Sequence, residues 1–176
     1  TRAGTPIART RQRYRASNRR RNNQSNSKMT AHVRNFFAPG IPKPQPRPRA
    51  VAIGGVVRMY TPSNVKGWRQ CVKIAVFNEG VKPLQPLAGS ISVNLGFIFE
   101  RPKSHFRTGK YSHLMKPDAP KAHTKKPDCD NLAKAVLDVL TELKFWNDDS
   151  QVTHLTTTKQ YGDQSGCQIS IAEISQ

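Results

Sequence analysis

Acidic side chains are concentrated in one stretch of an otherwise strongly basic chain. Asp128 and Asp130 precede a predicted helix, Asp148 and Asp149 follow it, and no Asp or Glu occurs before Glu79. Carboxylates are suitable ligands for Mg²⁺ or Mn²⁺. Mg²⁺ keeps several of its waters and needs only one or two carboxylates from the protein. The stretch therefore predicts a divalent-metal centre, in which the ion would polarise a phosphate ester and activate water.

The spacing of Asp128 and Asp130 indicates that these two side chains act together. Pro127 disfavours helix in the residue before it, so we expect an extended chain through Asp130 and a helix that begins after it. At the two-residue period of extended chain, both carboxylates leave the same side while Cys129 points into the protein. A third carboxylate, from the Asp148-Asp149 turn, would return across the helix to complete the site.

Lys134 lies one helical turn after Asp130, where its ammonium would stabilise charge developing on phosphoryl oxygens or on the leaving group. Ordinary structural roles are equally open at this point: an N-cap for Asp130, and for Lys134 an exposed i,i+4 pair with Asp138. Asp148 and Asp149 likewise suit a turn between helix and strand. Spacing alone does not decide between these interpretations.

The charge of the chain predicts a polyanionic partner. The formal net charge is +18, and 17 of the 29 Lys and Arg residues lie in residues 1–78, which contain no acid. Nucleic acid or an anionic membrane surface fits that balance. No apolar run approaches the roughly 20 residues that span a bilayer, no secretory signal is visible, and the three scattered cysteines look like reduced thiols. We therefore expect a cytoplasmic protein that is not membrane-bound.

Composition divides the chain into two parts. Residues 1–30 are rich in Arg, Asn, Ser and Gln, which predicts a disordered basic tail, and residues 31–176 are expected to form one domain. The first methionine is Met29, so the preceding residues are open to interpretation as a pro-segment, a fragment end or an upstream read-through. The Pro-rich run 42–49 must be extended. It is either a linker or an extended segment that presents Arg47 and Arg49 to phosphates.

The hydrophobic periodicity predicts an α+β fold with a small mixed or antiparallel sheet covered by helices. Strands are expected at 33–37, 91–99, 152–159 and 167–174, the last two paired as a hairpin, and helices at 65–77 and 131–143. Phe145 and Trp146 are expected to be core anchors after the second helix. A long basic connection, residues 101–127, shows little periodicity and is expected to be functional or mobile.

The order of residues in the acidic stretch resembles the RusA-type Holliday-junction resolvases. The stretch reads Lys-Pro-Asp-x-Asp-Asn-Leu-x-Lys over residues 126–134, then an amphipathic helix, then Phe-Trp-x-Asp-Asp-Ser-Gln-Val over residues 145–152 and a strand leading to Lys159. The resemblance extends over roughly residues 33–174.

The resemblance implies a homodimeric, Mg²⁺-dependent endonuclease, with Mn²⁺ as a second suitable ion, that cuts four-way DNA junctions by paired incisions in recombination and repair. By motif position, the catalytic metal ligands are Asp128, Asp130 and Asp149, the catalytic lysine is Lys134, and Asp148 is the less certain of the adjacent pair. The residues expected to contact DNA are Arg47, Arg49, Arg101, Lys103, Arg107 and Lys126. The protein would be encoded by a bacterium or a phage. Two other interpretations remain open. One is a non-catalytic nucleic-acid-binding protein, whose carboxylates only cap helices and form turns, and the other is an inactive prophage-type copy of the fold.

Overall fold

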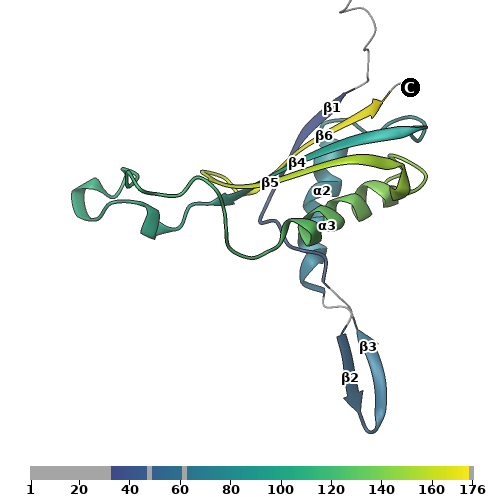
Figure 1. Cartoon of the computed structure of the whole chain (residues 1–176), viewed down its shortest axis with the longest axis horizontal. Coiled ribbons are helices and arrows are strands. Elements are labelled where there is room, and N and C mark those ends of the chain that lie inside the picture. Colours follow the sequence, from purple (N-terminus) through teal and green to yellow (C-terminus); the bar gives the residue numbers. More distant parts are fainter. Residues whose placement is uncertain (1–32, 47–48, 61–62, 175–176) are drawn as a thin grey trace, which may run out of the picture.

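A four-stranded mixed sheet in the order β1-β6-β4-β5 is the centre of the computed structural model, which describes residues 33–46, 49–60 and 63–174 (Figure 1). The strands are β1 (Arg34–Pro39), β4 (Ser90–Glu100), β5 (Val152–Gly162) and β6 (Gly166–Ile174). β6 runs antiparallel to both β1 and β4, whereas β5 runs parallel to β4. The predicted tail at residues 1–30 lies outside the described residues.

Both helices, α2 (Lys66–Asn78) and α3 (Cys129–Glu142), cover the same face of this sheet (Figure 1). α2 lies against β1 and α3 lies against β5. Every second residue of β4 from Ile91 to Phe99 is buried, and the residues between them are half-buried or exposed. This alternation fits a sheet with one covered face and one open face. None of the helices in the described ranges is long and apolar enough to cross a membrane.

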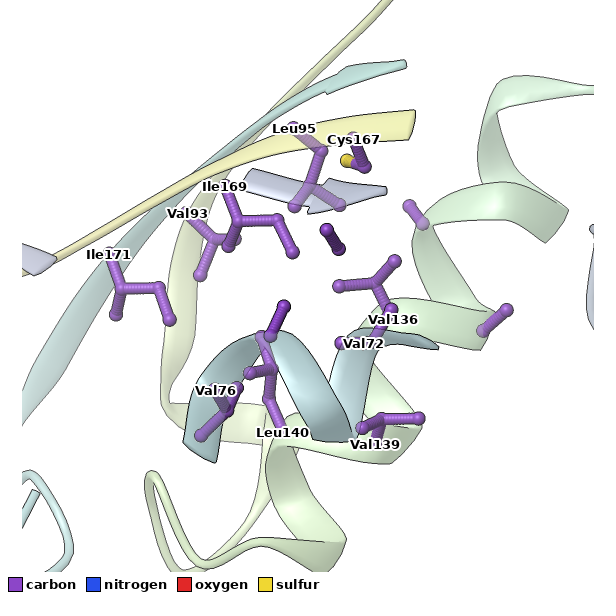
Figure 2. Packing of buried hydrophobic residues seen from close by; sticks show 14 of the residues in the cluster. Val72, Val76, Val93, Leu95, Val136, Val139, Leu140, Cys167, Ile169 and Ile171 are labelled. Atoms are coloured by element: carbon purple, nitrogen blue, oxygen red, sulfur yellow. The ribbon is translucent and has the colours of Figure 1, made fainter. Parts of the chain in front are cut away.

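The core lies between the sheet and the two helices (Figure 2). It includes Val72 and Val76 of α2, Val136, Val139 and Leu140 of α3, and Val93, Leu95, Ile169 and Ile171 of the sheet. Full burial of one such side chain contributes about 1.5–3 kcal/mol relative to exposure, so these residues fix how α3 lies on the sheet. Phe145 and Trp146 are fully buried, which confirms them as core anchors.

The α+β class with a mixed sheet is confirmed, but the predicted hairpin between the last two strands is wrong. β5 and β6 do not pair with each other, because each pairs with β4 from opposite sides. β5 is instead the second strand of a parallel β4-α3-β5 unit, a connection that requires a long crossover and usually a helix. The turn between Gly162 and Gly166 carries the chain across the C-terminal end of β4, from one side of that strand to the other.

A separate two-stranded hairpin, β2 (Arg49–Ile53) and β3 (Val56–Tyr60), was not predicted. Its signal was present: Gly54 and Gly55 separate two runs rich in β-branched residues, and both glycines adopt positive φ, at 60° and 80°. Two such glycines permit the tight turn that matches the twist of a hairpin. Four short 3-10 turns complete the described structure: η1 (Ser63–Val65), η2 (Lys103–His105), η3 (Gly109–Tyr111) and η4 (Asp149–Gln151).

Candidate active site

Asp128 and Asp130 lie at the start of α3, but only Asp128 lies in the extended chain that was predicted for both. The helix begins at Cys129, Asp128 is the N-cap residue with extended backbone (φ −78°, ψ 150°), and Asp130 belongs to the first turn. Asp at the N-cap and in the first turn favours helix formation, while Pro127 restricts only the residue before itself. The N-cap interpretation of Asp130 is therefore wrong, and Cys129 is half-buried rather than buried.

The carboxylates of Asp128 and Asp130 are exposed and largely uncommitted. Asp128 makes no capping hydrogen bond with its side chain. Asp130 accepts one weak hydrogen bond, from the side-chain amide of Asn131 at 3.3 Å. These oxygens are therefore available to a ligand from solvent.

Lys159 of β5 holds the segment that leads into Asp128. Its ammonium donates to the carbonyl oxygen of Lys125 at 2.8 Å and to that of Pro127 at 2.7 Å, and its own carbonyl accepts from the backbone N–H of His123 at 3.2 Å. Charge-assisted hydrogen bonds of this length are among the stronger ones in proteins. The position of Asp128 is thus fixed from the sheet, a role for Lys159 that the sequence pattern did not reveal.

The adjacent residues Asp148 and Asp149 differ in what their side chains do. Asp148 is the N-cap of η4 and accepts from the backbone N–H of Ser150 at 2.9 Å. Hydrogen bonds from Ser150, from its hydroxyl first and its backbone second, lower the pKa of Asp148. The side chain of Asp149 is exposed and makes no hydrogen bond or ion pair with any described residue. The turn interpretation is therefore correct for Asp148 and leaves Asp149 available.

Gln151 fixes this turn against the start of β4. Its side-chain oxygen accepts from the backbone N–H of Asn147 at 2.9 Å and of Asp148 at 3.3 Å. Its amide nitrogen donates to the carbonyl oxygens of Leu87 at 3.0 Å and Gly89 at 3.2 Å. Asp148 and Gln151 form a capping box, whose Asp-x-x-Gln pattern was readable in the sequence. Gln151 is thus a positioning residue that the sequence analysis missed.

Lys134 is 60% exposed and donates to Asp138 at 3.0 Å, so the ordinary i,i+4 pair is present. Asp138 also pairs with Arg69 of α2 at 3.6 Å. The hydrogen bond and charge of Asp138 raise the pKa of Lys134, and the carboxylate of Asp149 adds to the increase. Lys134 is therefore a protonated group whose ammonium lies near Asp149.

The structure does not bring the three predicted metal ligands together within one chain. α3 has 14 residues, or about 21 Å at the helical rise of 1.5 Å per residue. Asp128 lies at its first end, whereas the turn that carries Asp149 follows Trp146, whose indole donates to Thr141 near the last end at 2.7 Å. No group of three His, Cys, Asp or Glu side chains suited to a metal exists within residues 33–46, 49–60 and 63–174.

Asp128 and Asp130 nevertheless have the donor chemistry that Mg²⁺ requires. Mg²⁺ is commonly bound through one or two carboxylates, several waters and the phosphates of the substrate, rather than by a complete protein cage. Two exposed carboxylates that make almost no other bonds fit that mode of binding.

The predicted DNA contacts are only partly visible. Lys103, Arg107 and Lys126 are exposed on the basic strap, our name for residues 101–127 between β4 and α3, which extends away from the sheet (Figure 1). Arg101 is already engaged, because its guanidinium donates to the carbonyl oxygen of Pro120 at 2.9 Å and lies 5.8 Å from the ring centre of Tyr161. Arg47 and the side chain of Arg49 lie outside the described residues.

The fold and the site together define an α+β domain that carries an acid–lysine site beside a basic strap, as expected of a protein that acts on nucleic acid. The profile of the family Endodeoxyribonuclease RusA matches residues 39–172, and the chain belongs to this family. The uncharacterized protein YqaN of Bacillus subtilis (strain 168) is 31% identical over 145 residues, which cover 80% of this chain and 96% of that protein. The crossover junction endodeoxyribonuclease rusA of Lactococcus phage r1t is 37% identical over 51 residues, 29% of this chain and 39% of the phage protein. Membership identifies a nuclease of the Holliday-junction-resolvase kind.

Proposed function

We propose that the protein is an Mg²⁺-dependent, structure-specific endodeoxyribonuclease that resolves four-way DNA junctions in recombination and repair. The observation that carries the proposal is the pair of exposed, uncommitted carboxylates of Asp128 and Asp130 at the start of α3, inside the region that matches the nuclease family. The position of this pair is fixed by Lys159 from the sheet. Relatives in a bacterium and a phage fit our expectation of a cytoplasmic enzyme.

In this proposal Asp128 and Asp130 hold the ion, with Mn²⁺ as an alternative to Mg²⁺. The bound ion supplies Lewis-acid polarisation of the scissile phosphate and a lowered pKa of an attacking water. Lys134, kept protonated by Asp138 and Asp149, places a positive charge where negative charge develops on the phosphoryl oxygens or the leaving group. Asp149 is the third acid of the centre, held in place by the capped turn before β5.

Binding of the substrate is assigned to the basic surface. Lys103, Arg107 and Lys126 are exposed on the strap that leads directly into Asp128. Contacts from such side chains to phosphates set the position and register of a protein on DNA and carry no sequence information directly. Two opposed strands of a junction must be cut, so we propose a homodimer with one metal centre per subunit, matching the pseudo-two-fold symmetry of the substrate.

Replacement of one metal ligand tests the proposal. Asp130→Asn should lower the single-turnover cleavage rate on a synthetic immobile junction in Mg²⁺ by about 100-fold or more, with junction binding intact or tighter. Asp163→Asn makes the same chemical change in the exposed turn after β5 and serves as the matched control. Cleavage by Asp130→Asn at the wild-type rate would refute the metal site. A wild-type protein that binds junctions but cuts none in Mg²⁺ or Mn²⁺ would support the non-catalytic or inactive alternatives.

A further inference from the structure

The β2–β3 hairpin pairs with no other strand of the described structure. Its strands form a sheet of their own, and Figure 1 shows the ribbon projecting from the body of the protein. Val56, Val57 and Met59 are 58%, 68% and 64% exposed. An isolated two-stranded hairpin is marginally stable in water, and a contiguous group of exposed apolar side chains marks an interaction site.

The two faces of this ribbon differ in chemistry. Ala50 pairs with Met59 and Ala52 pairs with Val57, so these four exposed residues share one face that carries no charge. The opposite face carries the exposed residues Val51 and Arg58, which pair with each other, and Val56 next to the Gly54-Gly55 turn. The hairpin therefore combines three exposed apolar side chains of β3, Val56, Val57 and Met59, here called the apolar tip, with a cation and no anion.

The chain on both sides of the hairpin is held against α3, the helix that carries Asp130 and Lys134. Before the hairpin, the backbone N–H of Gln45 donates to the carbonyl oxygen of Asn131 at 2.8 Å. After it, Arg69 in the second turn of α2 pairs with Asp138 and with Glu142 of α3, the latter at 2.9 Å. The ribbon thus emerges beside the candidate active site.

The charge of the chain indicates which kind of partner the β2–β3 hairpin binds. The first 78 residues contain no acid, and the whole chain carries a formal net charge of +18. A second copy would bring the same positive charge to the hairpin, whereas a polyanion is complementary to it. Proteins that distort DNA insert apolar side chains between bases, and the cost of unstacking is a few kcal/mol per step in intact duplex. At a branch point the base stack is already interrupted, so that cost is smaller there.

We propose that the β2–β3 hairpin is a DNA-binding arm that inserts its apolar tip at the branch point of a junction and so contributes to the preference for branched over linear DNA. This inference rests on the proposed junction substrate. Arg58, on the face opposite the uncharged one, would contact a flanking phosphate.

The arm is tested in the full chain by the triple substitution Val56→Ser, Val57→Ser and Met59→Ser. Binding is measured without divalent cations to an immobile four-way junction carrying 2-aminopurine at the branch point, and to a linear duplex of the same length. We expect junction affinity to fall about 10-fold or more with little change for duplex, and the rise in 2-aminopurine fluorescence to disappear. The matched control is Ile74→Ser with Phe77→Ser, two exposed apolar residues of α2 that should leave both affinities unchanged.

A second variant, Arg58→Gln, separates the phosphate contact from insertion. It should keep the fluorescence rise and make the slope of log K against log salt shallower by about 0.9. Unchanged junction affinity and fluorescence in the triple variant would overturn the proposal. Loss of dimer mass in light scattering, confined to the triple variant, would also overturn it and assign the hairpin to subunit contact. A different result would separate the two proposals. If wild-type protein never cuts junctions, yet gives a fluorescence rise that the triple substitution abolishes, the nuclease proposal is refuted and the proposal of a DNA-binding arm is retained.

Discussion

At the scale of single residues, neighbouring aspartates of one motif carry out different tasks. The carboxylate of Asp148 caps η4, whereas Asp149 makes no hydrogen bond or ion pair with any described residue and acts only through its charge on Lys134. A carboxylate whose Oδ1 already accepts from a backbone N–H is oriented by the turn and keeps only part of its acceptor capacity for an ion, so Asp149 is the better candidate for a metal ligand. The structure thus distinguishes two residues that spacing alone left equivalent, and it does so in the same order as the family resemblance.

This difference predicts opposite effects of two substitutions. Asp149→Asn should reduce single-turnover cleavage by about 100-fold or more and leave the melting temperature nearly unchanged, because its side chain makes no bond within the fold. Asp148→Ala should lower the melting temperature through loss of the cap and keep most of the cleavage rate. Junction cleavage and thermal unfolding of both variants provide the measurement. The reverse pattern would transfer the catalytic role to Asp148.

Lys159 provides a second prediction for a single residue. Lys159→Met keeps the aliphatic stem but leaves the carbonyl oxygens of Lys125 and Pro127 without their donor, at a cost of about 1–3 kcal/mol that falls mainly on the part-buried carbonyl of Pro127. Asp128 would then be poorly positioned, so cleavage should require a higher Mg²⁺ concentration and recover partly at saturation. A positioning role also predicts partial rescue by Lys159→Arg. The control is Lys125→Met, which removes an exposed charge from the strap. An unchanged Mg²⁺ dependence in Lys159→Met would contradict the positioning role of Lys159.

At the scale of elements, the end of the basic strap is pinned along the outer edge of β5. The backbone N–H of Tyr161 donates to the carbonyl oxygen of Lys121 at 2.9 Å, and Ala122 bridges to Gln160. The ring of His123 stacks on Phe99 at a centroid distance of 4.1 Å. The strap is thus attached to the sheet immediately before it delivers Asp128 to the site.

The environment of His123 predicts a pH dependence of this attachment. Burial, followed by the charge of Lys159, lowers the pKa of His123 from its ordinary value of 6.5. The unfolded chain therefore takes up the proton first, so stability is fully present above about pH 6.5 and declines as the pH falls toward the lower pKa of the folded state. His123→Phe keeps a ring on Phe99 but cannot titrate. The decrease in melting temperature between pH 7.5 and 5.5 should be smaller in this variant than in the wild type, and equal decreases would refute the assignment.

Elements defined by local periodicity were predictable, and pairings between distant segments were not. α2, α3 and β4 agree with expectation because their apolar residues repeat at the period of a helix or strand within one window. The partner of β5 is instead β4, more than 50 residues earlier in the chain, so adjacency in sequence suggested the wrong hairpin. The β2–β3 hairpin was readable from Gly54-Gly55 and was missed.

The candidate site was predictable in its residue types and not in its geometry. The sequence placed Asp128, Asp130 and Lys134 at one end of a helix, and the structure agrees on that neighbourhood. Their supports are non-local: Lys159 reaches Pro127 across 32 positions, and Gln151 reaches Leu87 across 64. Contacts of that kind leave no periodic trace in a single sequence.

At the scale of the whole molecule, the three carboxylates that the motif groups together do not form one metal-binding cluster within the described part of a single chain. Asp128 lies at the start of a helix about 21 Å long, Asp149 follows the last residue of that helix by seven positions, and no set of three metal-binding side chains exists in the described ranges. A two-fold homodimer resolves this separation if Asp149 of one subunit faces Asp128 and Asp130 of the other. Such an arrangement keeps one metal centre per subunit.

The proposed dimer makes a specific prediction about mixed subunits. Light scattering should give about twice the chain mass of 19.7 kDa. If the centre is shared, Asp130→Asn and Asp149→Asn are each inactive as homodimers, but a heterodimer contains one centre with both substitutions and one centre with neither. Co-expressed variants should therefore recover single-strand nicking of a junction, while coincident cutting of both strands stays absent. Wild-type mixed with either variant is the positive control. A co-expressed pair that forms heterodimers and remains inactive would show that each centre is built within one chain. Asp149 must then move toward the start of α3 on DNA binding.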